Sequence, residues 1–138
     1  MQRSLLLTAD PIDEVALVRS RPASTSCGAV LVFNGVVRGQ ESGTAIAGLD
    51  YEAFEPMAIR QFDHLFDGLE ARWPQVESLR LVHRTGPVEA GETSLWLEIR
   101  SPHRAEAFAA GQWLIDEMKR VVPIWKRAML PPGGTATR

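Results

Sequence analysis

The sequence predicts an α+β sandwich in which a mainly antiparallel sheet packs against helices. Its elements follow the order βαββαββα, so several strands are adjacent in the chain and suited to antiparallel pairing. Two longer segments carry apolar residues at three- and four-residue steps, which is typical of helices with one buried face. The length of 138 residues suits one domain. We expect that domain over residues 1–130 and an irregular carboxyl-terminal tail over residues 131–138.

The first half of the chain is expected to contain strands and one short helix. In chain order these are a strand at 3–8, a helix at 11–20, a loop at 21–27 and strands at 28–38 and 45–54. Asp10 is the expected N-cap of the helix and Pro11 its first residue, a position that tolerates proline. Val, Leu and Phe fill residues 28–38, which predicts a largely buried strand with a glycine irregularity. The polar residues 39–43 predict a mobile connection.

The second half is expected to contain two long helices and a pair of strands. In chain order these are a helix at 55–73, strands at 76–85 and 93–100, and a helix from Ser101 and Pro102 to about Val121. The predicted buried stripe of the first helix is Ala58, Phe62, Leu65, Phe66, Leu69 and Trp73, and that of the second is Phe108, Gly111, Ile115, Met118 and Val122. Residues 86–92 form a hairpin-like connection. His83 shares a strand face with Leu79 and Leu81, so it need not be catalytic. Pro123 ends the last helix.

Composition and charge exclude several classes of protein. The formal net charge is −2, which argues against a nucleic-acid binder. No apolar run approaches the roughly 18 residues of a membrane span, and the first ten residues do not form a signal peptide, so we expect a cytoplasmic protein. The single cysteine, Cys27, cannot form an internal disulfide, and the three histidines are scattered. We therefore predict no metal site and no cofactor.

The two lysines of the chain are candidates for amine chemistry. Thirteen of the 15 basic residues are arginine, and the two lysines, Lys119 and Lys126, lie seven residues apart. An amine can lose its proton in a suitable environment, whereas a guanidinium does not. Residues 118–138 carry five basic side chains and no acidic one, which favours an anionic ligand or an acidic partner segment. A bias in the base composition of the gene and a solvated basic tail are the alternatives.

Two further segments predict contacts with an anion. Ser101, Pro102, His103 and Arg104 lie where a strand passes into a helix, and the first turn of a helix presents free N–H groups that favour phosphate or carboxylate. Arg38 ends a buried strand beside glycines. The alternative for His103 is a capping or exposed side chain. Because Pro123 breaks the last helix, the chain could turn there and bring Lys126 near Lys119.

Five motifs together resemble one enzyme family. They are GAVLVFNGVVR at 28–38, LDYEAFEPMA at 49–58, HRTGPVEAGE at 83–92, SPHRAEAF at 101–108 and IDEMKRVVPIWKR at 115–127. In this order and spacing, the chain resembles the catalytic large subunits of molybdopterin synthase. The resemblance covers about residues 28–127, and several ordered motifs are far more specific than any one of them.

This resemblance implies a sulfur-transfer enzyme of molybdenum-cofactor biosynthesis with an α/β-hammerhead type of fold. It implies a homodimer that binds a small ubiquitin-like sulfur-carrier subunit at each end, giving a heterotetramer. The carrier's Gly-Gly thiocarboxylate would enter a pocket of the large subunit. Sulfur would pass from it to cyclic pyranopterin monophosphate, forming the dithiolene of molybdopterin.

The resemblance also implies roles for individual residues. The implied catalytic residues are Lys119 and Lys126, and the implied substrate-binding residues are Val36, Val37, Arg38, His103, Arg104, Lys119, Lys126 and Arg127. Among these, Arg38, His103 and Arg104 would hold the phosphate and the pterin, and Val36 and Val37 would act through their backbone.

The sequence departs from the family pattern near its end. Ala128 stands where the resemblance implies an acidic residue, and a short tail replaces the usual extension with a tryptophan. These departures favour an alternative, a non-catalytic module of the same fold that binds a phosphopterin or a carrier. A purely structural dimeric subunit is a third possibility, but it leaves the two isolated lysines unexplained.

Overall fold

A four-stranded sheet forms the centre of the fold. The structure is a computed structural model that describes residues 1–132. The strand order is β1 (Gln2–Thr8), β6 (Ser78–Arg84), β8 (Thr93–Ser101) and β2 (Ala29–Val36). Neighbours pair antiparallel except β1 and β6, which run parallel. The predicted α+β class with a mainly antiparallel sheet is confirmed.

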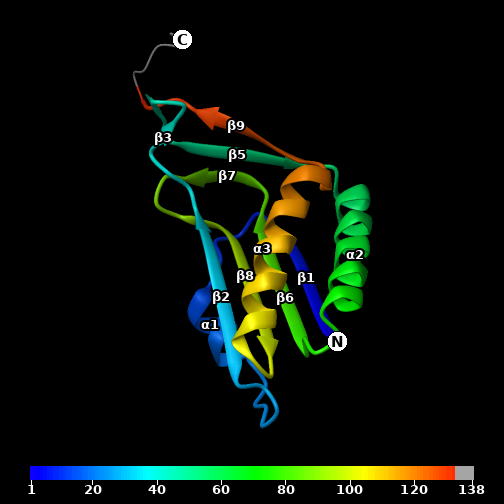
Figure 1. Ribbon diagram of the computed structural model, residues 1–138. Helices are drawn as coiled ribbons and strands as arrows, with labels where there is room; N and C mark the ends of the chain where they lie inside the picture. The colour runs from blue at the N-terminus through cyan, green and yellow to red at the C-terminus, as the bar shows by residue number, and fades with distance from the viewer. Residues whose placement is uncertain (133–138) are drawn as a thin grey trace.

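Two long helices cover one face of this sheet. These are α2 (Glu55–Arg72) and α3 (Arg104–Val121), which lie side by side in Figure 1. The predicted stripe of α2 is confirmed, because its buried residues are Ala58, Phe62, Leu65, Phe66 and Leu69. Trp73 lies at the rim of the core, partly buried against Trp113 of α3, with the two rings edge to face. The core between helices and sheet therefore fixes where α3 runs.

A second, three-stranded sheet lies across one end of the first. Its order is β7 (Gly86–Glu89), β5 (Gly48–Ala53) and β9 (Ile124–Met129), and all pairs are antiparallel. Figure 1 shows these strands crossing above the ends of β2 and β8, next to the carboxyl end of α3. The layer is packed around its own small core of Val37, Ile46, Leu49 and Val88.

The segment predicted to be a mobile connection is a small hairpin. It consists of β3 (Gln40–Glu41) and β4 (Thr44–Ala45), paired antiparallel. Ser42 and Gly43 form its two-residue turn with φ of 52° and 80°. Two successive positive φ values are those of a type I′ turn, whose twist matches that of paired strands.

Several element boundaries differ from the sequence-based expectation. The first helix, α1, spans Glu14–Arg19 and not 11–20, because the Asp13 side chain caps it by accepting a hydrogen bond from the Ala16 N–H at 3.0 Å. The expected connection at 86–92 contains β7, and the segment after Pro123 is β9. Both strands are short and form by pairing with β5, which a local pattern does not reveal.

The predicted buried stripe of α3 is confirmed except at Phe108. Gly111, Met118 and Val122 are buried as predicted, whereas Phe108 is 61 % exposed. The helix also buries three residues outside the predicted stripe, Ala107, Ala110 and Leu114. A Cβ at Gly111 would lie 3.0 Å from Leu31 of β2, so small residues let the helix approach the sheet closely.

Of the predicted tail, residues 133–138 lie outside the described residues. Within residues 1–132, no helix combines the length and apolarity needed to cross a membrane.

Removing an aromatic ring from the core should destabilise the fold strongly. Phe62 and Phe66 are 0 % and 1 % exposed and face the sheet from α2. Phe62→Ala or Phe66→Ala should lower the free energy of unfolding by about 3–5 kcal/mol, measured by urea denaturation. Phe54 is exposed, so Phe54→Ala is the matched control and should change the free energy of unfolding by less than about 0.5 kcal/mol. Unchanged stability of both core variants would contradict this placement of α2.

A buried carboxylate should make stability depend on pH. Glu98 on β8 is 1 % exposed and accepts hydrogen bonds from Arg21 Nε at 2.6 Å and Arg80 Nε at 3.0 Å. Burial alone would raise the pKa of Glu98, but the hydrogen bonds and charges of Arg80 and Arg21 together lower it. Arg80 also donates to the Leu17 carbonyl, so the cluster ties α1 to the sheet.

Because the folded-state pKa of Glu98 is lowered, its contribution is complete above the unfolded-state pKa of about 4.3. The contribution is then lost as the pH falls through the folded-state value. Glu98→Gln should cost about 3–5 kcal/mol at pH 7, since it leaves two arginines without their buried counter-ion. The difference between variant and wild type should shrink below pH 4 in urea titrations. An equal difference at pH 7 and pH 3 would refute this account.

Candidate functional site

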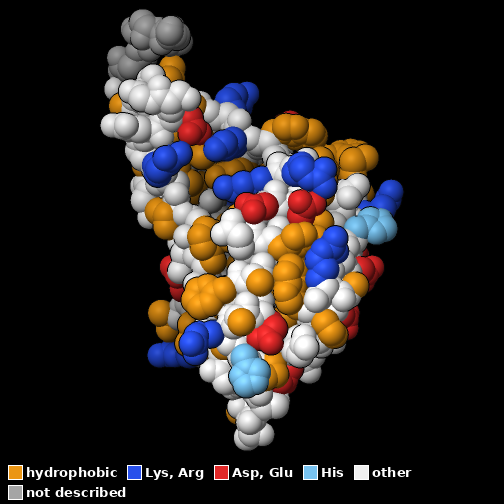
Figure 2. Space-filling view, in the orientation of Figure 1, with side chains coloured by type: hydrophobic (Ala, Val, Ile, Leu, Met, Phe, Trp, Pro, Cys, Tyr) orange, Lys and Arg blue, Asp and Glu red, His pale blue; other side chains and the backbone are white. Residues whose placement is uncertain are grey.

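A cavity of about 570 Å³ lies where the two sheets meet the carboxyl end of α3. Its walls come from the end of β2, the β3–β4 hairpin, β5, α3 and β9. The predicted site residues that line it are Val36, Val37, Arg38, Lys119 and Lys126. Figure 2 shows Lys and Arg side chains gathered in the upper part of this face, over the region of β3, β9 and the end of α3. The cavity therefore joins segments about 80 residues apart in the chain.

The end of β2 enters the cavity through an irregularity in the strand. The register against β8 shifts between Gly35 and Val36, which pair with Leu95 and Thr93, so the irregularity predicted at this glycine is a break in the pairing at which Ser94 of β8 is passed over. Beyond it, the Val37 N–H donates to the Glu92 carbonyl at 2.9 Å, and the Gly91 N–H donates to the Val37 carbonyl at 2.8 Å. These bonds fix the backbone that leads to Arg38.

The two lysines reach the cavity from either side of the break at Pro123. Lys119 lies in the last turn of α3, and Lys126 lies on β9 opposite Tyr51 of β5. Both side chains line the cavity, which agrees with the expectation that a turn of the chain at Pro123 could bring Lys126 near Lys119. Since the structure brings together the two lysines of the chain, a shared role in one site is the simplest interpretation of their spacing.

Arg127 does not join this cluster. Successive side chains of a strand point to opposite faces, so Arg127 points away from the cavity that Lys126 lines. Its guanidinium donates to Asp50 Oδ2 at 3.0 Å and is 82 % exposed. The expectation that Arg127 lines the same pocket is thus not met in this chain.

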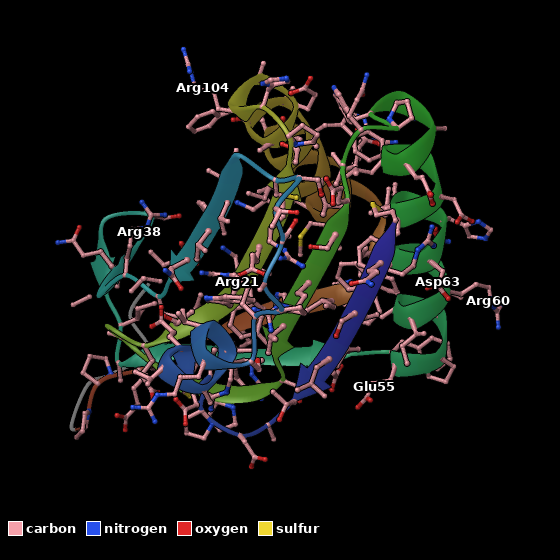
Figure 3. All side chains as sticks on the ribbon, turned by 90° about the horizontal axis from the view of Figure 1, so that it is seen from below. Arg21, Arg38, Glu55, Arg60, Asp63 and Arg104 are labelled. Atoms are coloured by element: carbon pink, nitrogen blue, oxygen red, sulfur yellow. The ribbon has the colours of Figure 1, made fainter. Side chains whose placement is uncertain are left out.

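His103 and Arg104 lie at the other end of α3. His103 is its N-cap, and Arg104 its first residue. At 1.5 Å per residue, the helix separates them from Lys119 by roughly 22 Å along its axis. Figure 3 shows Arg104 and Arg38 in separate parts of the molecule. One chain by itself does not bring these two residues to the cavity.

An aromatic and polar group that sequence reasoning missed forms the floor of the cavity. The Tyr51 hydroxyl lies 3.2 Å from Ser94 Oγ, which donates to the Gly35 carbonyl at 3.3 Å. The His83 ring packs edge to face against Tyr51, with 5.2 Å between the ring centroids. Burial lowers the pKa of His83, and a neutral ring donates through Nδ1 to the Arg84 carbonyl at 2.7 Å. That His83 need not be catalytic stays a prediction, because its ring lines the cavity.

One acidic side chain also reaches the cavity. Glu41 of β3 places its carboxylate 3.4 Å from Lys126 Nζ and 3.9 Å from Arg38 Nη2. It is the only acid among the described residues that line the cavity. Sequence reasoning missed it, because the polar segment at 39–43 carried no periodic signal. Across residues 1–132, no group of three or more His, Cys, Asp or Glu side chains could hold a metal ion.

Comparison with known proteins identifies the family. A family model described as MoaE protein matches residues 7–121. The chain belongs to the MoaE family. A molybdopterin synthase catalytic subunit from Culex quinquefasciatus is 39 % identical over 129 residues, which cover 94 % of this chain and 82 % of the relative. A molybdopterin synthase catalytic subunit from Pyrococcus abyssi is 36 % identical over 121 residues, which cover 88 % of this chain and 78 % of the relative.

Solved structures of the family share the fold. The molybdopterin synthase of Staphylococcus aureus superposes with a TM-score of 0.82 at 32 % identity, over 91 % of this chain and 90 % of that one. A complex of subunits 1 and 2 of the molybdopterin-converting factor from Helicobacter pylori has a TM-score of 0.74 at 24 % identity. That alignment covers 93 % of this chain and 84 % of the other. The family resemblance read from the motifs is confirmed, and so is the fold expected with it.

Proposed function

We propose that this chain is the catalytic subunit of a molybdopterin synthase, which transfers sulfur from a small carrier protein to cyclic pyranopterin monophosphate. The observation that carries the proposal is the convergence of Arg38, Lys119 and Lys126 on one cavity. A phosphorylated pterin and a carrier thiocarboxylate are both anions, and a cationic cavity attracts both. The catalytic subunits named among its relatives support the same conclusion.

The three cations can each contribute to a different part of the sulfur transfer. Arg38 is suited to the substrate's phosphate, because a guanidinium binds phosphate oxygens in a forked geometry. Lys119 and Lys126 can stabilise negative charge that develops on sulfur and oxygen as the carbon–sulfur bond of the thiocarboxylate breaks. An amine can also donate and accept a proton, or accept the carrier's acyl group transiently, as a guanidinium cannot. We assign that role to Lys119.

We infer that the partner is a small carrier with a thin carboxyl-terminal tail. The Helicobacter pylori relative was solved as a complex of two different subunits, and we extend that mode of assembly to this chain. A tail ending in Gly-Gly has no side chains to collide with the walls of a cavity of about 570 Å³ that, in this proposal, also accommodates a pterin. Its terminal group carries the negative charge that the cavity favours.

We further infer a homodimer that completes the site. The edge strand β2 exposes the apolar side chains Val30, Val32, Phe33 and Val36. If two copies pair antiparallel along β2, the amino end of one β2 meets the carboxyl end of the other. That amino end holds the start of α3, because the Gly28 N–H donates to the Pro102 carbonyl at 3.1 Å.

This arrangement accounts for the distance between the two halves of the site. The eight residues of β2 span roughly 26 Å, close to the roughly 22 Å that separate His103 from Lys119 along α3. The partner's His103 and the partner's Arg104 would thus reach the mouth of the cavity that contains Arg38. The residues expected to bind the substrate would come together between two chains.

Reconstitution tests the proposed function directly. Purified protein is mixed with its thiocarboxylated carrier and cyclic pyranopterin monophosphate, and the dithiolene product is quantified. We expect product formation that depends on both additions. Binding of the carrier and the pterin without any product would support the non-catalytic module, which Ala128 and the altered tail favour.

Replacing Lys119 by arginine should separate charge from amine chemistry. Lys119→Arg keeps the positive charge but supplies no amine, so single-turnover sulfur transfer should fall by about 10²–10⁴-fold. Lys119 is exposed and lies off the buried stripe of α3, so the melting temperature should stay within about 2 °C. Lys119→Ala is the comparison for loss of both properties. Near wild-type turnover by the arginine variant would leave Lys126 as the better candidate for the amine.

The shared site predicts complementation between two inactive variants. Light scattering should give twice the 15.3 kDa of one chain. Lys119→Ala and His103→Ala should each lose turnover as homodimers. After the two are unfolded and refolded together, about one quarter of the cavities should be intact, because each mixed dimer has one wild-type site. No recovery of turnover in mixed dimers would place both residues in the same chain's site.

A further inference from the structure

The carboxylate of Glu41 sits between two of the three cations of the cavity. Its Oε2 lies 3.4 Å from Lys126 Nζ, and its Oε1 lies 3.9 Å from Arg38 Nη2. Glu41 itself is 30 % exposed, so it reaches inward from the hairpin. Figure 3 shows Arg38 at the side of the molecule that the β3–β4 hairpin forms. An anionic oxygen pair therefore already occupies the space between Arg38 and Lys126 in the unliganded chain.

The contacts that hold this carboxylate are weak. The side chains of Arg38 and Lys126 are 83 % and 55 % exposed. Ion pairs of such exposure are screened by water and salt and contribute little to stability. Neither distance is that of a close charge-assisted hydrogen bond. A ligand anion can therefore displace the carboxylate.

The tip of the hairpin that carries Glu41 has few contacts of its own, and the base of the hairpin is anchored separately. Two residue pairs form its ladder, Gln40 with Ala45 and Glu41 with Thr44. The base is anchored by the Ile46 N–H, which donates to the Gly39 carbonyl at 3.0 Å, and by the buried Ile46 side chain. A rotation of the Glu41 side chain, or a small movement of the tip, leaves this anchor intact.

We propose that Glu41 is a specificity-determining residue, an internal counter-ion that occupies an anion subsite between Arg38 and Lys126 and is displaced by the ligand's own anion. This inference rests on the proposed function for the identity of the ligand, which is either a phosphate monoester or the carrier's terminal carboxylate group. The carboxylate balances the two cations while the site is empty. It also makes entry selective, because a neutral ligand gains nothing there to offset the contacts that Glu41 gives up.

Anion titrations of Glu41→Gln test the proposal without turnover. The probes are inorganic phosphate and a short peptide that ends in Gly-Gly, each followed by chemical shifts of the backbone amides around Arg38 and Lys126. Glu41→Gln should bind at least one probe about three- to tenfold more tightly than the wild type at low salt, because no carboxylate competes. The gain should shrink as salt is added. The probe whose affinity rises identifies the source of the anion.

Glu52→Gln is the matched control. Glu52 is exposed, lies next to Tyr51 on β5 and points to the face opposite the cavity. Its substitution changes the net charge of the protein by the same amount as Glu41→Gln. It should leave both affinities within a factor of about 1.5, since distant exposed charges are screened. Glu41→Asp keeps the charge and should stay near the wild type, and melting curves verify that each variant folds. Equal or weaker binding of both probes by Glu41→Gln would overturn the inference, whatever reconstitution shows about turnover.

Discussion

The length of α3 is the constraint on which the arrangement of the site depends. Its 18 residues form a straight element of roughly 27 Å, held against β2 and β8 by small buried residues such as Ala110 and Gly111. The helix carries Lys119 at one end and Arg104 at the other. Since the core does not let the helix bend or slide, no local adjustment can bring these two cations together. A site that uses both would need two chains, and in the proposed dimer the exposed edge of β2 is where the second chain pairs.

Two local features of strands decide which side chains meet in the cavity. The pairing of β2 with β8 shifts register at Gly35 and Val36, just before the segment that carries Arg38 to the cavity. On β9, pairing with β5 fixes the alternation, so Lys126 lies on the face of Tyr51 and Arg127 on the face of Asp50. A shift of one residue in this pairing would exchange the two cations. The geometry of the site thus depends on register as much as on residue type.

The sequence predicted most of the fold, and it predicted the cavity only in part. Helical periodicity located α2 well, since its apolar stripe is narrow and continuous. It gave most of the stripe of α3 but wrongly included Phe108 and omitted Ala107 and Ala110, because that helix packs partly through small residues, which carry a weak apolar signal. The pairing of β7 and β9 with β5 depends on contacts distant in the chain, which local patterns do not encode. For the same reason, the sequence identified Lys119 and Lys126 but not the acid between the cations, Glu41, which a two-residue strand brings there.

Bringing three cations to one cavity costs free energy, and the structure limits that cost. Two unit charges 4 Å apart repel by about 1 kcal/mol in a fully aqueous setting and about 4 kcal/mol near a protein surface. Because the side chains of Arg38 and Lys126 are exposed, the repulsion between them lies close to the aqueous value. The carboxylate of Glu41 offsets part of this repulsion. A ligand that enters also excludes water, so each attraction between the cations and its anions strengthens as the site closes. The cavity can therefore be stable while it is hydrated, and its attraction for anions would become strongest when the proposed substrate and carrier tail exclude the water.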